Sequence, residues 1–227
     1  MQKTIFITAT DTGVGKTTVS AAIAKIAKEA GINVGYFKPV ETGCNPECLD
    51  AKLLAEITGQ PYEETVLYRF KNPVAPLVAE REEGLKISIE QINKHLKVLK
   101  EKYQFLIVEG AGGIAVPITK IKDRFYTYID FASENNLKTV VVSRATLGTI
   151  NHTFLTVKAL KDNNIETAGI ILNKYPENPT LSEKTNPYII KEMTGVDIIS
   201  ICKERKNCIK ECQERLKDFL EFFLYII

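Results

Sequence analysis

The sequence predicts an α/β fold, with one doubly wound, mostly parallel sheet and helices on both of its faces. Short apolar runs typical of strands alternate with longer stretches that have the periodicity of amphipathic helices. The run at 105–108 is apolar throughout, as expected for a strand covered on both faces. No hairpin signal joins two of these runs, so each strand is expected to return to the sheet through a helix.

The predicted elements follow one another along the whole chain. Strands are expected at residues 4–8, 34–38, 105–109, 139–143, 168–172 and 196–201, and helices at 19–30, 89–99 and 150–160. The segment 70–84 contains Pro73 and Pro76 and is expected to be a long connection. We therefore expect a single domain over residues 1–227, with its functional groups at the carboxyl ends of the strands.

The charge of the chain argues against polyanionic partners. It has 30 basic and 28 acidic residues, a formal net charge of +2, which leaves no excess to hold a phosphodiester backbone. The apolar stretch at 219–227 is too short to cross a bilayer, and it is expected to pack as a helix or a strand. We expect no nucleic-acid partner and no membrane partner. Because no secretory leader is recognisable, we also expect a cytoplasmic location.

The cysteines do not have the spacing of a metal site. The chain contains five, Cys44, Cys48, Cys202, Cys208 and Cys212. Their separations differ from the paired Cys-x-x-Cys pattern of zinc sites. In a chain of this size without a secretory leader, free or buried thiols are the expected state.

A phosphate-binding loop is predicted at residues 10–18, T-D-T-G-V-G-K-T-T. It follows a strand and opens a helix, so backbone N–H groups and the positive helix end converge on a bound anion. Lys16 is expected to reach the β- and γ-phosphates, and the Thr17 hydroxyl to coordinate Mg²⁺. Thr10 stands where the usual pattern has glycine. The predicted nucleotide-binding residues of the loop are Asp11, Thr12, Gly13, Val14, Gly15, Lys16, Thr17 and Thr18.

Charged residues at the ends of other predicted elements are candidates for binding metal or phosphate. Glu109 ends an apolar strand, where an unpaired carboxylate is unusual. Asp50 begins a predicted helix, where it either binds Mg²⁺ or only interacts with the helix dipole. Lys38 ends the second strand, where it either faces the phosphate loop or is solvated.

Three further polar residues, Asn173, His95 and His152, are considered as candidates for a role in binding or catalysis. Asn173 ends a strand, where its amide either contacts a nucleobase or caps a turn. His95 falls on the polar side of a predicted helix and is expected to be solvated, while His152 lies at a helix start. We predict that neither histidine is a catalytic base.

Five motifs taken together resemble the dethiobiotin synthetase family. They are T-D-T-G-V-G-K-T-T, Y-F-K-P-V-E-T-G, V-E-G-A-G-G, T-L-G-T-I-N-H and the strand that ends at Asn173, and they extend from residue 4 to about residue 173. The resemblance implies a fold like that of P-loop NTPases. It also implies an enzyme of biotin biosynthesis that closes the ureido ring of dethiobiotin. Its substrates are 7,8-diaminopelargonic acid, CO₂ and ATP with Mg²⁺, and the reaction passes through a carbamate and a carbamic-phosphoric anhydride to release ADP and phosphate.

The resemblance also implies roles for individual residues. The implied catalytic residues are Lys16, Lys38, Thr12 and Thr42. Mg²⁺ would be held by Thr17, Asp50 and Glu109, and the adenine contacted by Asn173. The implied substrate-binding residues are Lys38, Thr42, Gly112, Gly148, Thr149, Ile150 and Asn151, the last four across the interface of a homodimer.

The chain departs from the family pattern at several positions. Thr42 stands where serine is frequent, and Gly13 where some members have glutamate. The late Ile-Pro motif of the family lacks its proline here, which weakens the expectation that the C-terminal part recognises the base.

The main alternative is a partitioning or septum-site ATPase, which is a nucleotide-switched binding protein. That branch carries a lysine in K-G-G-x-G-K-T where this chain has Asp11, a reversal of charge beside the phosphates. A cobyrinic-acid-type amidating synthetase would need an additional amidotransferase domain, for which the chain is too short. A P-loop protein without activity would be expected to have lost Lys38 or Glu109.

Overall fold

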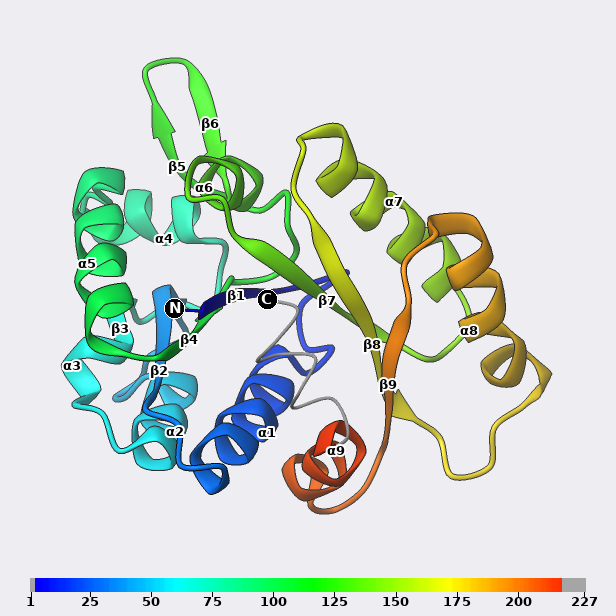
Figure 1. Cartoon of the computed structure of the whole chain (residues 1–227). Coiled ribbons are helices and arrows are strands. Elements are labelled where there is room, and N and C mark those ends of the chain that lie inside the picture. The colour runs from blue at the N-terminus through cyan, green and yellow to red at the C-terminus, as the bar shows by residue number, and fades with distance from the viewer. Residues whose placement is uncertain (1–2, 218–227) are drawn as a thin grey trace.

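A computed structural model describes residues 3–217, and within them a seven-stranded sheet runs through the centre (Figure 1). The strand order is β3-β2-β4-β1-β7-β8-β9, and every neighbouring pair is parallel. The strands are β1 (Lys3–Ala9), β2 (Val34–Thr42), β3 (Val66–Phe70), β4 (Phe105–Glu109), β7 (Lys138–Arg144), β8 (Thr167–Tyr175) and β9 (Ile198–Lys203). The predicted fold class is confirmed, and each predicted strand is present. Strand β3 was not predicted.

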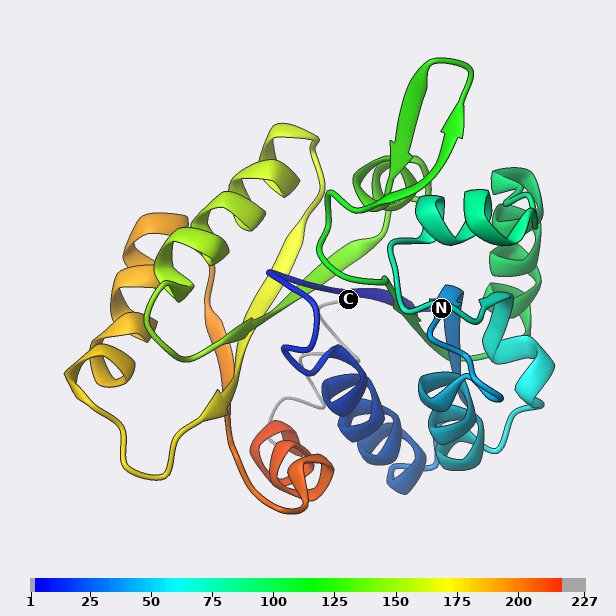
Figure 2. The same cartoon turned by 180° about the vertical axis from the view of Figure 1, so that it is seen from behind.

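Helices cover both faces of the sheet, as the views from the front and from behind show (Figures 1 and 2). One face carries α1 (Lys16–Glu29), α2 (Leu49–Thr58) and α9 (Cys208–Leu216), and the other α5 (Ile89–Lys102), α6 (Tyr128–Glu134), α7 (Thr149–Asp162) and α8 (Leu181–Thr194). Strand β1 illustrates why two layers form. Its Ile5 and Ile7 pack on the α1 side, whereas Phe6 points to the opposite face and contacts Phe131 of α6. This alternation buries both faces of the strand.

Two expectations about the connections are wrong. An antiparallel hairpin of β5 (Pro117–Ile121) and β6 (Arg124–Thr127) projects beyond the main sheet. Its turn has Lys122 at φ 53°, a left-handed conformation that asparagine or glycine would have signalled, so the hairpin had no sequence signature. Segment 70–84 also contains a helix, α4 (Pro76–Glu83), because Pro76 occupies the first helical turn, where proline is favourable. A short helix, α3 (Tyr62–Thr65), precedes β3.

The expectation of free thiols is wrong for four of the five cysteines, all of which the structure describes. Cys44 and Cys48 form a disulfide because the chain between β2 and α2 folds back on itself and brings their Cα atoms within 4.2 Å. Cys202 on β9 and Cys212 on α9 form the second disulfide, since this helix packs on that strand, and Cys208 is free.

Two expectations concern segments at or near the surface. His95 is not simply solvated, because its ring packs 5.0 Å from that of Phe37 and its Nε2 lies 3.0 Å from the Glu64 carbonyl oxygen.

In the part of the chain that the structure describes, none of the helices combines the length and apolar character of a membrane span. The predicted terminal helix or strand at 219–227 lies outside the described residues.

Candidate active site

Parallel pairing brings the predicted site residues to one edge of the sheet. Ile7 of β1 pairs with Glu109 of β4, so Glu109 lies beside the point where β1 leads into the phosphate loop. On the other side of β4, Phe37 pairs with Val108, which places Lys38 next to Glu109. The phosphate loop, Lys38 and Glu109 therefore meet on three adjacent strands, as the sequence predicts. Lys38 does not end its strand as predicted, because β2 continues beyond it to Thr42.

The phosphate loop is shaped by Gly15, which is the N-cap of α1 and has φ 103°. A Cβ atom at this position would lie 2.0 Å from Asn173 Nδ2, so both the backbone conformation and the close approach require glycine. The Asn173 amide, at the end of β8, donates a hydrogen bond to the Val14 carbonyl oxygen at 2.9 Å. Asn173 thus supports the loop from β8, which β7 separates from β1 in the sheet, and its contact with adenine stays a prediction.

The first turn of α1 is suited to bind an anion. It contains Lys16 and Thr17 and no acidic residue, and its N-cap is a glycine without a side chain to occupy the N–H groups. The Lys16 side chain is buried, and this burial lowers its pKa. A buried cation at a positive helix end favours a negatively charged ligand.

Glu109 is fully buried and receives hydrogen bonds from two hydroxyl groups of α1. Thr17 Oγ1 donates to Glu109 Oε1 at 2.9 Å, and Ser20 Oγ donates to Oε2 at 2.6 Å. Ser20 was not among the predicted site residues. Its position could have indicated a role in the site, because it lies three residues after Thr17 and residues three apart share a face of a helix.

Lys38 lies between two carboxylates. Its Nζ is 3.4 Å from Glu109 Oε1 and forms an ion pair with Asp50 of α2. Burial alone would lower the pKa of Lys38, but Glu109 and Asp50 raise it more, so the net shift is upward and the ammonium stays charged. Asp50 lies in the first turn of α2, where it can interact with the helix dipole. Its carboxylate also forms the ion pair with Lys38.

These residues line a pocket of about 390 Å³. Of the predicted site residues, the pocket is lined by Thr12, Gly13, Gly15, Lys16, Thr17, Thr18, Lys38, Thr42, Asp50, Glu109 and Gly112. It also contains Lys174, which the sequence analysis missed and which has φ 55°. Catalytic, nucleotide-binding and metal-binding candidates from separate parts of the sequence are thus brought together.

The predicted substrate residues at the start of α7 lie elsewhere. In the described part of this one chain, Gly148, Thr149, Ile150 and Asn151 do not line the 390 Å³ pocket. Gly148 and Thr149 instead border a pocket of about 90 Å³ on the other side of the phosphate loop, next to Asp11 and Arg144. Arg144, also missed, donates from Nη2 to the Thr12 carbonyl oxygen at 3.3 Å and lies 3.8 Å from Asp11.

A second pocket extends the main one toward apolar surface. It has a volume of about 310 Å³ and shares Thr12, Thr42 and Gly112 with the main pocket. Its other walls are mostly apolar and include Pro73, Val74, Ala75, Pro76 and Val116. The first four of these were expected only as part of a connection, because nothing in their sequence assigns them to a site.

The main pocket contains oxygen atoms of the chemical kind that binds magnesium. Thr17, Asp50 and Glu109 offer one hydroxyl and two carboxylates, which are the hard oxygen ligands that Mg²⁺ prefers. Lys38 pairs with both carboxylates and keeps them together at the mouth of the phosphate loop.

Fold and site together define a nucleotide-binding protein of the P-loop class. A family model described as "AAA domain" matches residues 3–211. ATP-dependent dethiobiotin synthetase BioD of Aquifex aeolicus is 50% identical over 192 residues, which cover 85% of each chain. The enzymes of that name from Hydrogenobaculum sp. and Clostridium perfringens are 43% and 39% identical, covering 89% and 97% of this chain and 90% and 99% of their own. The chain belongs to the dethiobiotin synthetase family.

Solved structures support the fold. A ParA family ATPase from Chlorobium tepidum aligns with TM-score 0.60 at 13% identity, covering 97% of this chain and 99% of its own. MinD of Aquifex aeolicus aligns with TM-score 0.54 at 17% identity, covering 97% and 94%. At these identities the likeness concerns the fold alone, and the sequence relatives favour the synthetase over the partitioning ATPase.

Proposed function

We propose that this protein closes the ureido ring of dethiobiotin from 7,8-diaminopelargonic acid, CO₂ and ATP, releasing ADP and phosphate. The observation that carries the proposal is the position of Lys38, a buried cation beside the phosphate loop and between two carboxylates. The reaction develops negative charge on a carbamate and then on a transferred phosphoryl group. Fixed cations that face this charge are the main way in which a protein accelerates such a step.

Each step of the proposed ring closure would use particular residues of the pocket. One substrate amine captures CO₂ as a carbamate, whose oxygen accepts the γ-phosphate, and the second amine then attacks and expels phosphate. Lys16 and Lys38 would neutralise these groups, while Thr12 and Thr42 would hydrogen-bond to them. Thr17, Asp50 and Glu109 would hold Mg²⁺, which neutralises phosphate charge when bound. No general base is required, since the unprotonated amines are themselves the nucleophiles.

The adjoining pockets support this choice of substrate. A diamino acid has reactive amines at one part of a long aliphatic chain. The amines would lie near Lys38 and Thr42, and the aliphatic chain along the apolar pocket that contains Val74 and Val116. The two pockets share wall residues, so one extended molecule can occupy both.

A homodimer would complete the site. The residues from Gly148 to Asn151 begin α7, and the N-terminal end of a helix suits a carboxylate, but they lie apart from the main pocket of their own chain. We propose that they receive the substrate carboxylate in the site of a second copy. Leu147 and Leu155 are 86% and 53% exposed around this helix and offer apolar surface for the contact. Light scattering should give twice the mass of one chain. We further propose that the enzyme acts in the cytoplasm, where its ATP is available.

One experiment tests the proposed reaction. Purified protein with MgATP, bicarbonate and 7,8-diaminopelargonic acid should yield dethiobiotin, detected by mass spectrometry, together with one phosphate per product. Release of phosphate without dethiobiotin would refute the synthetase and leave an ATPase of the partitioning type as the explanation. Omission of the diamino acid should abolish phosphate release beyond the background rate.

A further inference from the structure

The first turn of α2 is held by a residue outside the helix. Its N-cap, Cys48, has its side chain in the disulfide with Cys44, so it cannot accept hydrogen bonds as a serine or aspartate cap would. The N–H groups that follow therefore need another acceptor. This turn matters for the site because its second residue is Asp50.

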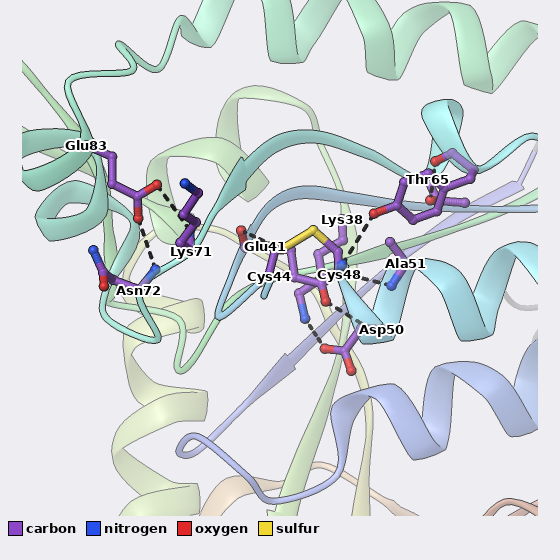
Figure 3. Close-up of a disulfide and its surroundings, with 11 residues drawn as sticks. Lys38, Glu41, Cys44, Cys48, Asp50, Ala51, Thr65, Lys71, Asn72 and Glu83 are labelled. Atoms are coloured by element: carbon purple, nitrogen blue, oxygen red, sulfur yellow. Dashed lines mark hydrogen bonds and ion pairs between the residues drawn. A yellow bond between two sulfur atoms is a disulfide. The ribbon is translucent and has the colours of Figure 1, made fainter. Parts of the chain in front are cut away.

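Glu41 supplies that acceptor from β2. Its Oε1 accepts the Asp50 N–H at 2.9 Å, and its Oε2 accepts the Ala51 N–H at 3.0 Å. The residue is 5% exposed, so its carboxylate is bonded in the interior and not in solvent. Figure 3 shows the Glu41 carboxylate pointing at this turn beside the disulfide. A carboxylate at a helix N-terminus is favoured by the helix dipole as well as by its hydrogen bonds.

Strand β2 thereby holds Asp50 at two points. Glu41 binds its main-chain N–H, and Lys38, three residues earlier on the same strand, pairs with its side chain. Figure 3 shows Lys38 and Glu41 reaching toward Asp50 from the same strand. The main-chain contact fixes where the Asp50 Cα lies relative to Lys38, so the side chain does not depend on the ion pair alone.

We propose that Glu41 is a positioning residue, which holds the first turn of α2 on β2 and so sets the Asp50 carboxylate at the metal site. The role of Asp50 as a metal ligand rests on the proposed function, whereas the contact of Glu41 with α2 does not. A displacement of about 1 Å at such a ligand is enough to weaken the chemistry that depends on it. Glu41 is not among the residues that line the 390 Å³ pocket, so it acts through Asp50.

Glu83 provides a matched control. Its carboxylate accepts two successive backbone N–H groups in the same way, those of Lys71 and Asn72 at 3.1 and 3.0 Å. Figure 3 shows both arrangements side by side, one on each side of the disulfide. Glu83→Gln therefore removes the same kind of contact without affecting the turn that carries Asp50.

The experiment compares Glu41→Gln, Glu83→Gln, Asp50→Asn and the double variant Glu41→Gln/Asp50→Asn. Binding of Mn²⁺ in the presence of ADP is measured by electron paramagnetic resonance, and the Mg²⁺ concentration for half-maximal rate is measured in parallel. Glu41→Gln should weaken both at least fivefold, and Glu83→Gln should stay within twofold of the wild type. Because Glu41 acts through Asp50, the double variant should match Asp50→Asn.

Hydrogen exchange separates this proposal from the proposed function. The Asp50 and Ala51 amides should exchange faster in Glu41→Gln than in the wild type. Faster exchange with unchanged Mn²⁺ binding would overturn the positioning role. A double variant much weaker than Asp50→Asn would also overturn it. If Mn²⁺ binding changes as expected but the wild type makes no dethiobiotin, only the proposed reaction fails. Should Glu41→Gln not fold, Glu41→Asp, which keeps the charge but is shorter, must weaken Mn²⁺ binding in the same direction.

Discussion

Ser20 donates its hydroxyl to Glu109 Oε2 at 2.6 Å, and both residues are fully buried. The contact joins the second turn of α1 to the carboxyl end of β4, while Thr17 from the first turn binds the other oxygen of the same carboxylate. One helix therefore fixes both oxygens. The orientation of Glu109 is set before any ligand binds.

Ser20→Ala should destabilise the protein. The variant leaves one oxygen of a buried carboxylate without its donor, a loss of about 1.5 to 3 kcal/mol for a hydrogen bond to a charged group. Urea unfolding measures the change. Ser133→Ala is the control, because that hydroxyl is on the surface and its loss should change the free energy of unfolding by less than about 0.5 kcal/mol. Equal stability of the two variants would show that the Ser20 contact contributes little.

Gly15→Ala should disrupt the phosphate loop. The new methyl group would lie 2.0 Å from Asn173 Nδ2, so the loop or the asparagine must move. We expect ATP affinity to fall at least about tenfold, which corresponds to about 1.4 kcal/mol, measured by isothermal titration calorimetry.

The Gly84→Ala variant distinguishes the steric collision of a new methyl group from the cost of placing alanine at a positive φ. Gly84 also has positive φ, at 70°, but a Cβ there meets nothing within 4 Å. Both variants bear the cost of a left-handed alanine, about 1 to 2 kcal/mol of stability. Only Gly15→Ala should lose ATP affinity, and a similar loss in Gly84→Ala would contradict the collision argument.

Much of the site could be predicted because its residues interrupt apolar patterns. Glu109 is a charged residue at the end of β4 and Lys38 is a charged residue within β2, and the parallel pairing of these strands brings the two side chains to the same level of the sheet. The contact from Glu41 to α2 could not be predicted, since it joins residues nine and ten positions apart with no local pattern. The pairing of Cys44 with Cys48 depends on how the connection folds back, which their spacing does not determine.

The Cys44–Cys48 disulfide should stabilise the fold modestly. It closes a short loop, for which the chain-entropy relation gives about 2 kcal/mol. Under non-reducing conditions, Cys44→Ala/Cys48→Ala, which adds no capping hydroxyl to α2, should therefore lose about 2 kcal/mol in denaturant unfolding. A thiol assay on the denatured, unreduced wild type should find the one free cysteine, Cys208. Five titratable thiols would show that neither disulfide forms in the purified protein.

Glu80 should make stability depend on pH in the acid range. Burial alone would raise the pKa of Glu80, but Lys86, the Thr119 hydroxyl and the Ile87 N–H lower it more. A lowered pKa in the folded state means that the carboxylate stabilises the fold above its unfolded pKa, about 4.3. This stabilisation is lost as the pH falls through the folded pKa.

Glu80→Gln isolates that contribution. From about pH 4.3 downward, the free energy of unfolding should fall more steeply with acidity in the wild type than in the variant. Urea unfolding at several pH values measures the slopes. Glu82→Gln, on the exposed side of the same helix, should keep the wild-type slope. Identical slopes for Glu80→Gln and the wild type would contradict the assignment.

Lys38→Met should reduce both catalysis and stability. The ammonium is the cation shared by Glu109 and Asp50, and its raised pKa keeps it charged at any pH at which the enzyme is assayed. Loss of one charge-neutralising group in the transition state typically costs a few kcal/mol, so kcat should fall at least about tenfold. The free energy of unfolding should fall by about 3 kcal/mol, because Glu109 is left buried without its cation.

Lys52→Met shows whether the position of the charge matters. Lys52 follows Asp50 on α2 and pairs with Glu47 at 2.5 Å, but both side chains are about half exposed. A surface pair of this kind contributes at most about 1 kcal/mol, so stability should change little and kcat should be unchanged. If Lys38→Met retained the wild-type kcat, the buried lysine would not face the charge that develops in the reaction. A loss of stability without a loss of kcat would limit Lys38 to holding the two carboxylates together.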